Sequence, residues 1–184
     1  DIFQDPHSKY NLELIQRINI RAFCRFEEVD TTGSRGTTKT YTIFLATLCF
    51  GILYPGVIKR YFGPTQKQAA QLASDTFKEI SENYPLLTAH WRVVSDAQER
   101  FEIKTDYGSE ISITAMRGDN AHGVIAEETS QAESGQAFDH EKFRSAVLPA
   151  IRLRRMIDRE VDENCPQFQK LYIQSAGTQQ NPSF

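Results

Sequence analysis

The sequence predicts an α/β protein with a mainly parallel central sheet flanked by helices. Three observations support this fold class. Strand-like and helix-like segments alternate along the 184 residues. A glycine-rich loop at residues 33–40 separates a β-rich segment from an apolar run, and a short apolar segment at 123–126 ends in two carboxylates. A chain of this length can form one domain with a sizeable core.

In the first half of the chain, we expect a helix around residues 12–20 and a β-rich segment at 23–29. The apolar run at 41–50 is long enough for a buried helix, which we expect to end at Gly51. A strand is expected at 56–62. Thr65 and Gln68 then have the spacing of a capping box, and the next helix is expected to end at Tyr84. The buried face of that helix is expected to contain Ala69, Leu72, Ala73, Phe77 and Ile80.

In the second half, segments 91–94, 101–104 and 110–115 alternate like strands of a small antiparallel extension, with a turn at 106–109. Residues 123–126 are all apolar, which is typical of a strand buried on both faces. A helical pattern covers 145–161, where Pro149 is expected to kink or divide the helix. The last strand is expected at 171–173. Around that helix, the arginines Arg152, Arg154, Arg155 and Arg159 are expected on a charged outer face, and the acids Asp158, Glu160, Asp162 and Glu163 at a solvated helix end.

Composition narrows the functional classes. The net charge of −3 does not indicate nucleic-acid binding by bulk electrostatics. No apolar stretch reaches the roughly 18 residues that span a bilayer, so we expect no membrane association. The three cysteines are odd in number and widely spaced, which predicts reduced thiols of an intracellular protein and no disulfide framework. The four histidines show no metal-ligand spacing with them, so a zinc site is not expected.

The loop at residues 33–40 has the spacing of a phosphate-binding loop, GxxxxGK[ST], between a β-rich segment and an apolar helix. Its residues are Gly33, Ser34, Arg35, Gly36, Thr37, Thr38, Lys39 and Thr40. Small residues allow backbone N–H groups to face phosphates, Lys39 can reach the terminal phosphates, and the Thr40 hydroxyl can bind Mg²⁺. Thr38 stands where the second glycine of the pattern normally lies.

Two consecutive carboxylates, Glu127 and Glu128, follow the apolar strand at 123–126. The carboxyl edge of a parallel sheet is where α/β proteins bind ligands. At this position we expect Glu127 to serve Mg²⁺ and Glu128 to polarise the attacking water. The alternative is that both glutamates begin a solvated loop. Arg117 precedes this strand and can stabilise charge on a transferring phosphoryl group, or simply lie at the surface beside a turn glycine.

With these motifs taken together, the chain resembles the ATPase domain of a large terminase, the motor that packages DNA into viral procapsids. The resemblance covers about residues 23–180 and depends on four segments in the same order. They are the loop at 33–40 with Arg35 before its lysine, the segment 60–69, Arg117-Gly118 with the strand ending at Glu128, and the segment 175–178. The resemblance implies a P-loop NTPase fold of the ASCE/RecA-like kind.

The resemblance also implies roles for individual residues. Lys39 would bind the β- and γ-phosphates of ATP, Thr40 and Glu127 would ligate Mg²⁺, and Glu128 would be the catalytic carboxylate. Arg35 would contact the γ-phosphate. Further expected roles are an arginine finger for the next subunit at Arg117, and a coupling motif that links hydrolysis to translocation at Ser175, Ala176, Gly177 and Thr178. The adenine contacts stay open, with Gln16 among the candidates.

The implied partners are double-stranded DNA, a portal protein and a small terminase subunit. We expect a homo-oligomeric ring when active, with a monomer allowed for the isolated domain, in the host cytoplasm and transiently at the portal vertex of the procapsid. We expect residues 1–184 to be a single ATPase domain truncated at its C-terminal side, without the nuclease domain of large terminases. Two departures from the family pattern, Thr38 and Glu127, place the closure of the loop and the Mg²⁺ shell in question.

Three other functions stay open. A helicase-like motor of the same class would need a second motor lobe. A small P-loop kinase would need an acceptor site and an arginine-rich lid. A nucleotide-binding assembly module would bind ATP at the same loop but hydrolyse it weakly, because of Thr38.

Overall fold

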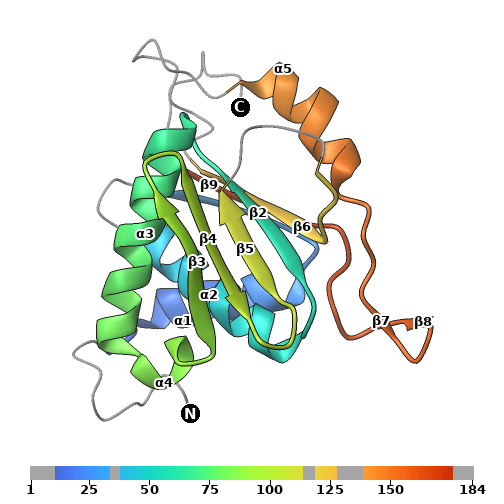
Figure 1. The fold of residues 1–184 in the computed structure, drawn as a ribbon, viewed down its shortest axis with the longest axis horizontal. Helices are drawn as coiled ribbons and strands as arrows, with labels where there is room; N and C mark the ends of the chain where they lie inside the picture. Colours follow the sequence, from blue (N-terminus) through green and yellow to red (C-terminus); the bar gives the residue numbers. More distant parts are fainter. Residues whose placement is uncertain (1–10, 34–37, 114–118, 128–138, 176–184) are drawn as a thin grey trace.

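The computed structural model describes residues 11–33, 38–113, 119–127 and 139–175. Its centre is a seven-stranded sheet in the order β1-β9-β6-β2-β5-β4-β3 (Figure 1). The strands are β1 Glu28–Gly33, β2 Ile58–Phe62, β3 Trp91–Ala97, β4 Arg100–Thr105, β5 Glu110–Ile113, β6 Gly123–Glu127 and β9 Gln169–Ser175. The five strands from β1 to β5 in that order pair in parallel, and β4 and β3 add an antiparallel hairpin. The predicted fold class is confirmed.

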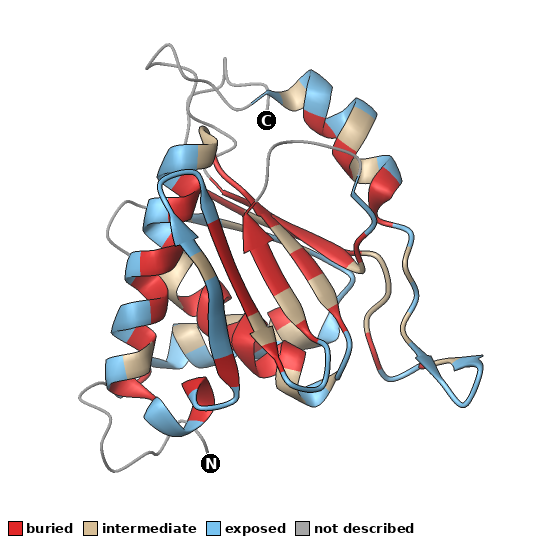
Figure 2. Ribbon diagram, viewed as in Figure 1, coloured by how far each residue is buried: buried red, intermediate tan, exposed pale blue. Residues whose placement is uncertain are grey.

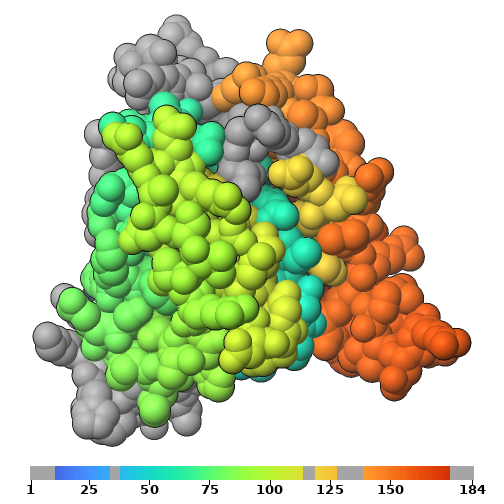
Figure 3. Space-filling model, viewed as in Figure 1, coloured from blue at the N-terminus to red at the C-terminus, as the bar shows by residue number. Residues whose placement is uncertain are grey.

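Helices cover both faces of the sheet. The helices α1 Leu14–Arg25, α2 Lys39–Leu53, α3 Gln66–Asn83 and α4 Pro85–Thr88 share one hydrophobic core with the sheet. On the other face, α5 His140–Lys142 continues as a π-helical turn, Phe143–Val147, and a 3-10 turn, Leu148–Ala150, packed on Phe62, Val124 and Ala126. Figure 2 shows the central strands buried between these two layers. In the space-filling view, the β3–β4 hairpin forms one flank and the segment from α5 to β8 the opposite flank (Figure 3).

Helix α2 is the centre of the larger core, and it does not end at Gly51 as predicted. It continues to Leu53, and its residues from Thr42 to Gly51 are all buried. At Gly51 a side chain would lie 2.6 Å from the Trp91 ring, so the absence of a side chain lets the indole pack against the helix backbone. Gly51 is therefore explained by close packing against Trp91, since it does not end the helix.

The β-rich segment predicted at 23–29 is wrong in position, because α1 continues to Arg25 and β1 begins at Glu28. Helix α1 begins with a capping box between Glu13 and Gln16, and it buries Ile20 and Phe23, whose spacing of three places both on one helix face. Helix α3 begins as predicted, with the Thr65 side chain accepting a hydrogen bond from the Gln68 amide. Its predicted buried face is correct except for Leu72, which is 40% exposed.

The helix predicted at 145–161 is wrong in its second half. The helical segment ends at Ala150, and the chain then forms a hairpin of β7 Met156–Ile157 and β8 Glu160–Val161. Its two turn residues, Asp158 and Arg159, have φ of 51° and 73°, as a two-residue type I′ turn requires. The helical spacing of the arginines and apolar residues therefore did not reflect a helix.

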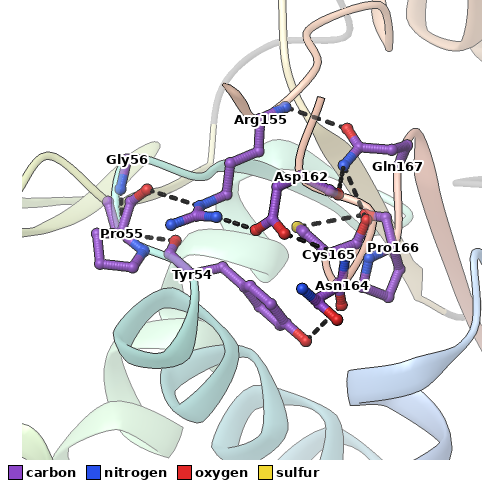
Figure 4. A network of polar contacts seen from close by, with 10 residues as sticks. Tyr54, Pro55, Gly56, Arg155, Asp162, Asn164, Cys165, Pro166 and Gln167 are labelled. Carbon is purple, nitrogen blue, oxygen red and sulfur yellow. Dashed lines mark hydrogen bonds and ion pairs between the residues drawn. The ribbon is translucent and has the colours of Figure 1, made fainter. Parts of the chain in front are cut away.

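A buried ion pair closes the base of this hairpin (Figure 4). The Arg155 guanidinium contacts the Asp162 carboxylate, and Arg155 also donates to the Pro55 carbonyl at 3.1 Å. The side chains of Arg155 and Asp162 are 14% and 4% exposed. Tyr54 adds a hydrogen bond from its hydroxyl to the Asn164 carbonyl at 2.7 Å. Asp162 is thus a buried structural acid and not part of a solvated helix end.

A second buried polar group lies at the amino end of β2. The Lys59 ammonium donates to the Gln169 side-chain oxygen and lies 4.1 Å from the centre of the Phe50 ring. Gln169 in turn donates to the carbonyls of Phe23 and Phe26 at 2.6 and 2.7 Å, which ties the start of β9 to the end of α1. Complete burial lowers the pKa of Lys59 from 10.5 to about 7, because a charged amine loses its hydration there.

The three cysteines are free thiols, as the sequence predicted. Over the residues described, no helix combines the length and the apolar character needed to cross a bilayer. The same residues contain no cluster of three or more histidine, cysteine, aspartate or glutamate side chains suited to a metal ion.

Candidate active site

Three neighbouring parallel strands end at one edge of the sheet, and each carries a predicted site segment. Strand β1 ends at Gly33, β6 ends at Glu127, and β9, which lies between them, ends at Ser175. The pairing register aligns Gly33 with Ser175, and Glu127 with Ile173. The start of the phosphate loop, the acidic strand end and the start of the segment 175–178 therefore meet at the carboxyl edge, where α/β sheets bind ligands.

One contact at this edge joins Thr40 and Glu127, which are 87 residues apart in the sequence. In strand β6 the side chains alternate, so Glu127 faces the same side as Ile125, toward α2, and is 3% exposed. Helix α2 begins at Lys39, and the Thr40 hydroxyl donates a hydrogen bond to the Glu127 carboxylate. The fold thus brings the two predicted metal ligands into direct contact.

These two oxygen donors fit Mg²⁺ accompanying a nucleotide. Mg²⁺ binds hard oxygen ligands and commonly uses only one or two protein groups, with substrate phosphates and water completing its octahedral shell. A hydroxyl beside a buried carboxylate is such a pair. The longer side chain of Glu127, compared with aspartate, still reaches Thr40. The departure from the family pattern is therefore compatible with a Mg²⁺ site at this point.

Lys39 lies at the carboxyl side of the predicted phosphate-binding loop, residues 33–40. Its ammonium donates to the Gly33 carbonyl at 3.1 Å, across the span of the loop. The N–H groups at the start of α2, a helix of 15 residues, carry partial positive charge at the same point. Together they produce a positive field at the end of β1, which is the electrostatic requirement for binding an anion such as phosphate.

Thr38 has the backbone conformation that a glycine would adopt most easily. Its φ is 53° and its ψ is 27°, in the left-handed region, which costs an L residue about 1–2 kcal/mol. The Thr38 hydroxyl accepts a hydrogen bond of 2.7 Å from the Gln16 side chain, and the Gln16 oxygen accepts from the Glu13 amide at 2.8 Å. The loop thus keeps left-handed geometry at this position, and a contact from α1 accompanies the threonine.

Sequence reasoning missed a second contact at this edge, between Gln174 and Asp30. The Gln174 side-chain nitrogen lies 3.0 and 2.9 Å from the two carboxylate oxygens of Asp30. Gln174 directly precedes Ser175, and Asp30 lies three residues before Gly33. No motif marks this pair, because its members are 144 residues apart and only the β1–β9 pairing joins them. Likewise, the contact of Gln16 with Thr38 followed from no sequence signal.

Several predicted site residues lie outside the described part of the chain. They are Ser34, Arg35, Gly36, Thr37, Arg117, Glu128, Ala176, Gly177 and Thr178. The described members of the site are Gly33, Thr38, Lys39, Thr40, Glu127 and the backbone of Ser175. For these, the structure establishes proximity at one sheet edge.

Several solved structures share the fold of this chain at low sequence identity. Neither a protein-family model nor a curated protein matches the chain. The Thermus phage P74-26 large terminase ATPase domain matches with a TM-score of 0.59 and 16% identity, over 90% of this chain and 65% of that one. The bacteriophage HK97 large terminase matches with a TM-score of 0.61 and 15% identity, over 91% of this chain and 34% of that one.

A third match is the N-terminal domain of the DNA packaging ATPase from bacteriophage phi29, with a TM-score of 0.57 and 16% identity. It covers 100% of this chain and 84% of that one. The chain thus spans about a third of the HK97 terminase chain and most of the phi29 domain. Likeness at these identities defines the fold alone. The chain therefore has the mostly parallel α/β fold seen in the P74-26 large terminase ATPase domain, the HK97 large terminase and the phi29 packaging ATPase domain.

Proposed function

We propose that this chain hydrolyses ATP to drive double-stranded DNA into a viral procapsid, as the ATPase part of a large terminase. The observation that carries the proposal is the contact of the Thr40 hydroxyl, at the start of α2, with the buried Glu127 carboxylate at the end of β6. It joins a phosphate loop to an acidic strand end, as MgATP hydrolysis requires. Further support comes from the fold likeness to the phi29 protein, which is described as a DNA packaging ATPase.

In this proposal, Lys39 binds the β- and γ-phosphates, and Thr40 and Glu127 hold the Mg²⁺ that accompanies ATP. Glu128 orients and polarises the attacking water. Burial of Glu127 supports its assignment to the metal, because a carboxylate that is 3% exposed is suited to a fixed ligand position.

The remaining roles concern the assembly. Arg35 contacts the γ-phosphate within the subunit, and Arg117 enters the site of the neighbouring subunit in a homo-oligomeric ring. Residues 175–178 couple nucleotide state to the part of the motor that grips DNA. The partners are double-stranded DNA, a portal protein and a small terminase subunit, and the place of action is the portal vertex in the host cytoplasm.

The left-handed φ of Thr38 favours an active enzyme over an assembly module with weak hydrolysis. The weak-hydrolysis alternative assumed that a β-branched residue would not adopt the glycine conformation. Because Thr38 adopts it, the start of α2 keeps the arrangement that brings Thr40 to Glu127. A helicase-like motor and a packaging motor of this fold are distinguished by what they do to duplex DNA, because a helicase unwinds the duplex and a packaging motor moves it intact.

The proposal is tested by steady-state ATP turnover with and without duplex DNA, on the native chain and on Glu128→Ala and Arg117→Ala. Glu79→Ala, on the exposed face of α3, serves as the matched carboxylate control. We expect Glu128→Ala and Arg117→Ala each to abolish turnover, and Glu79→Ala to leave it unchanged. Mixing the two inactive variants is expected to restore activity, because a mixed ring contains sites with an intact Glu128 and a finger from the neighbour.

Hydrolysis that survives Glu128→Ala would contradict the catalytic assignment. A mixture that stays inactive would contradict the transfer of Arg117 between subunits. Unwinding of a forked duplex without packaging of linear duplex would favour the helicase-like alternative.

A further inference from the structure

The contact between Gln174 and Asp30 joins the paired strands β9 and β1 near their carboxyl ends. Gln174 is 7% exposed and lies on β9 immediately before the segment 175–178. Its side-chain nitrogen contacts both oxygens of Asp30 on β1, at 3.0 and 2.9 Å. Asp30 precedes the loop at 33–40 by three residues, and Gln174 precedes the segment 175–178 by one. This contact therefore joins the two strands just before the two segments whose states a motor has to link.

The opposite end of β9 is held by a separate buried contact. Gln169, the first residue of β9, donates to the carbonyls of Phe23 and Phe26 and accepts from Lys59. The start of the strand is therefore fixed to the body of the domain. A displacement of β1 at its carboxyl end can then reach the same end of β9, which is paired with β1 along residues 28–33 and is also held to it by the Gln174–Asp30 side-chain contact.

Asp30 is well placed to move with the nucleotide. It is exposed on β1, which is the outermost strand at its side of the sheet among the residues described. The Thr32 hydroxyl, one residue before Gly33, also donates to Asp30 at 3.4 Å. An edge strand has neighbours on one side only, so it shifts at lower cost than a central strand does. A shift of Asp30 would then displace the buried Gln174 side chain that contacts it.

We propose that Gln174 is a positioning residue that, through Asp30, links nucleotide occupancy of the loop at 33–40 to the position of residues 175–178. This inference depends on the proposed function, because it requires that ATP binds at the loop. Linkage of two sites needs an element whose state both sites influence, and the paired ends of β1 and β9 are that element.

The test is hydrogen exchange measured by mass spectrometry with and without MgATP, on two peptides, 38–45 at the start of α2 and 171–178 at the end of β9. Gln174→Glu places a carboxylate against the Asp30 carboxylate and breaks the contact by repulsion. Asp30→Asn keeps a hydrogen bond between two amides. The double variant Asp30→Asn with Gln174→Glu exchanges the polarity, so that an amide at position 30 donates to a carboxylate at position 174.

The chain offers a matched control on α3. The Gln71 side-chain nitrogen lies 3.0 and 2.9 Å from the two oxygens of Asp75, the same chemistry at an exposed place outside the active-site edge. Gln71→Glu therefore makes the same substitution against the same kind of partner. A thermal melt of every variant confirms that it is folded at the temperature of the exchange measurement.

In the native chain we expect MgATP to slow exchange about fivefold or more in both peptides, the lower end of typical coupling between sites. In Gln174→Glu we expect slowing in 38–45 only. Asp30→Asn, the double variant and Gln71→Glu are expected to behave like the native chain. The double variant separates transmission from local loosening of β9, because it keeps glutamate at position 174 but restores the contact with position 30.

Two results would overturn the inference while nucleotide binding stands. The first is a Gln174→Glu variant whose 171–178 peptide still responds to MgATP as in the native chain. The second is a double variant that stays uncoupled although it is folded and protected at 38–45. If the native chain shows no protection at 38–45, the proposed function fails instead, and the inference fails with it.

Discussion

Replacing Thr40 by valine tests the central contact of the site. Valine has nearly the same shape but no hydroxyl, so the buried Glu127 carboxylate loses the hydrogen bond from Thr40. Hydrogen bonds to charged groups contribute about 1.5–3 kcal/mol. For a chain of 184 residues, a loss of that size lowers Tm by about 2–4 °C per kcal/mol, hence by about 4–8 °C for a typical value of 2 kcal/mol.

The same substitution is expected to weaken MgATP binding at least about tenfold, since the proposed function makes the Thr40 hydroxyl an oxygen ligand of the metal. Thermal melts without nucleotide measure the first effect, and calorimetric titration with MgATP measures the second. Thr40→Ser keeps the hydroxyl and should retain both properties. Thr47→Val on the same helix removes a hydroxyl that donates to the Ile43 carbonyl at 2.7 Å and should leave MgATP affinity unchanged.

Two outcomes would refute this reasoning separately. An unchanged Tm for Thr40→Val would mean that its hydrogen bond to Glu127 does not stabilise the fold. Native MgATP affinity in a variant with lowered Tm would mean that Thr40 is structural and does not ligate the metal.

Three further predictions concern stability and are read from urea denaturation. Thr38→Gly should be about 1 kcal/mol more stable than Thr38→Val. Both variants lose the hydrogen bond from Gln16, but only glycine relieves the strain of the left-handed backbone, and its own entropic cost offsets part of that gain. Equal stability of the two variants would show that the backbone at position 38 is not strained. Lys59 has a folded pKa of about 7, below its ordinary 10.5, so the unfolded chain binds more protons between these values and stability should rise with pH across that window. Lys59→Met should remove that rise, and a slope identical to that of the native chain would assign it to other groups. Asp162→Ala should lower the free energy of unfolding by about 3–5 kcal/mol, because it leaves the Arg155 charge buried and unpaired. The double variant Arg155→Met with Asp162→Leu should recover most of that stability. If the losses of the two single variants simply add in the double variant, the two side chains do not form a buried pair.

The parts of the fold that were predicted correctly depend on local signals. The apolar run of α2, the cap at Thr65 and the apolar run at 123–126 in β6 are each signalled by residues of the element itself or directly beside it. The errors occurred where tertiary contacts override a local pattern. The arginines near 155 have helical spacing, yet the ion pair with Asp162 and the left-handed turn make that segment a hairpin.

The candidate site divides in the same way. Its phosphate-loop spacing and its acidic strand end are contiguous in the chain, so the sequence by itself determined that a nucleotide site was to be expected, and which residue types would form it. Only the tertiary structure decided that Thr40 touches Glu127, that Gln16 contacts Thr38, and that Gln174 contacts Asp30. The physical reason is that these pairs lie 87, 22 and 144 residues apart, and their proximity depends on strand order and register, which no local pattern contains.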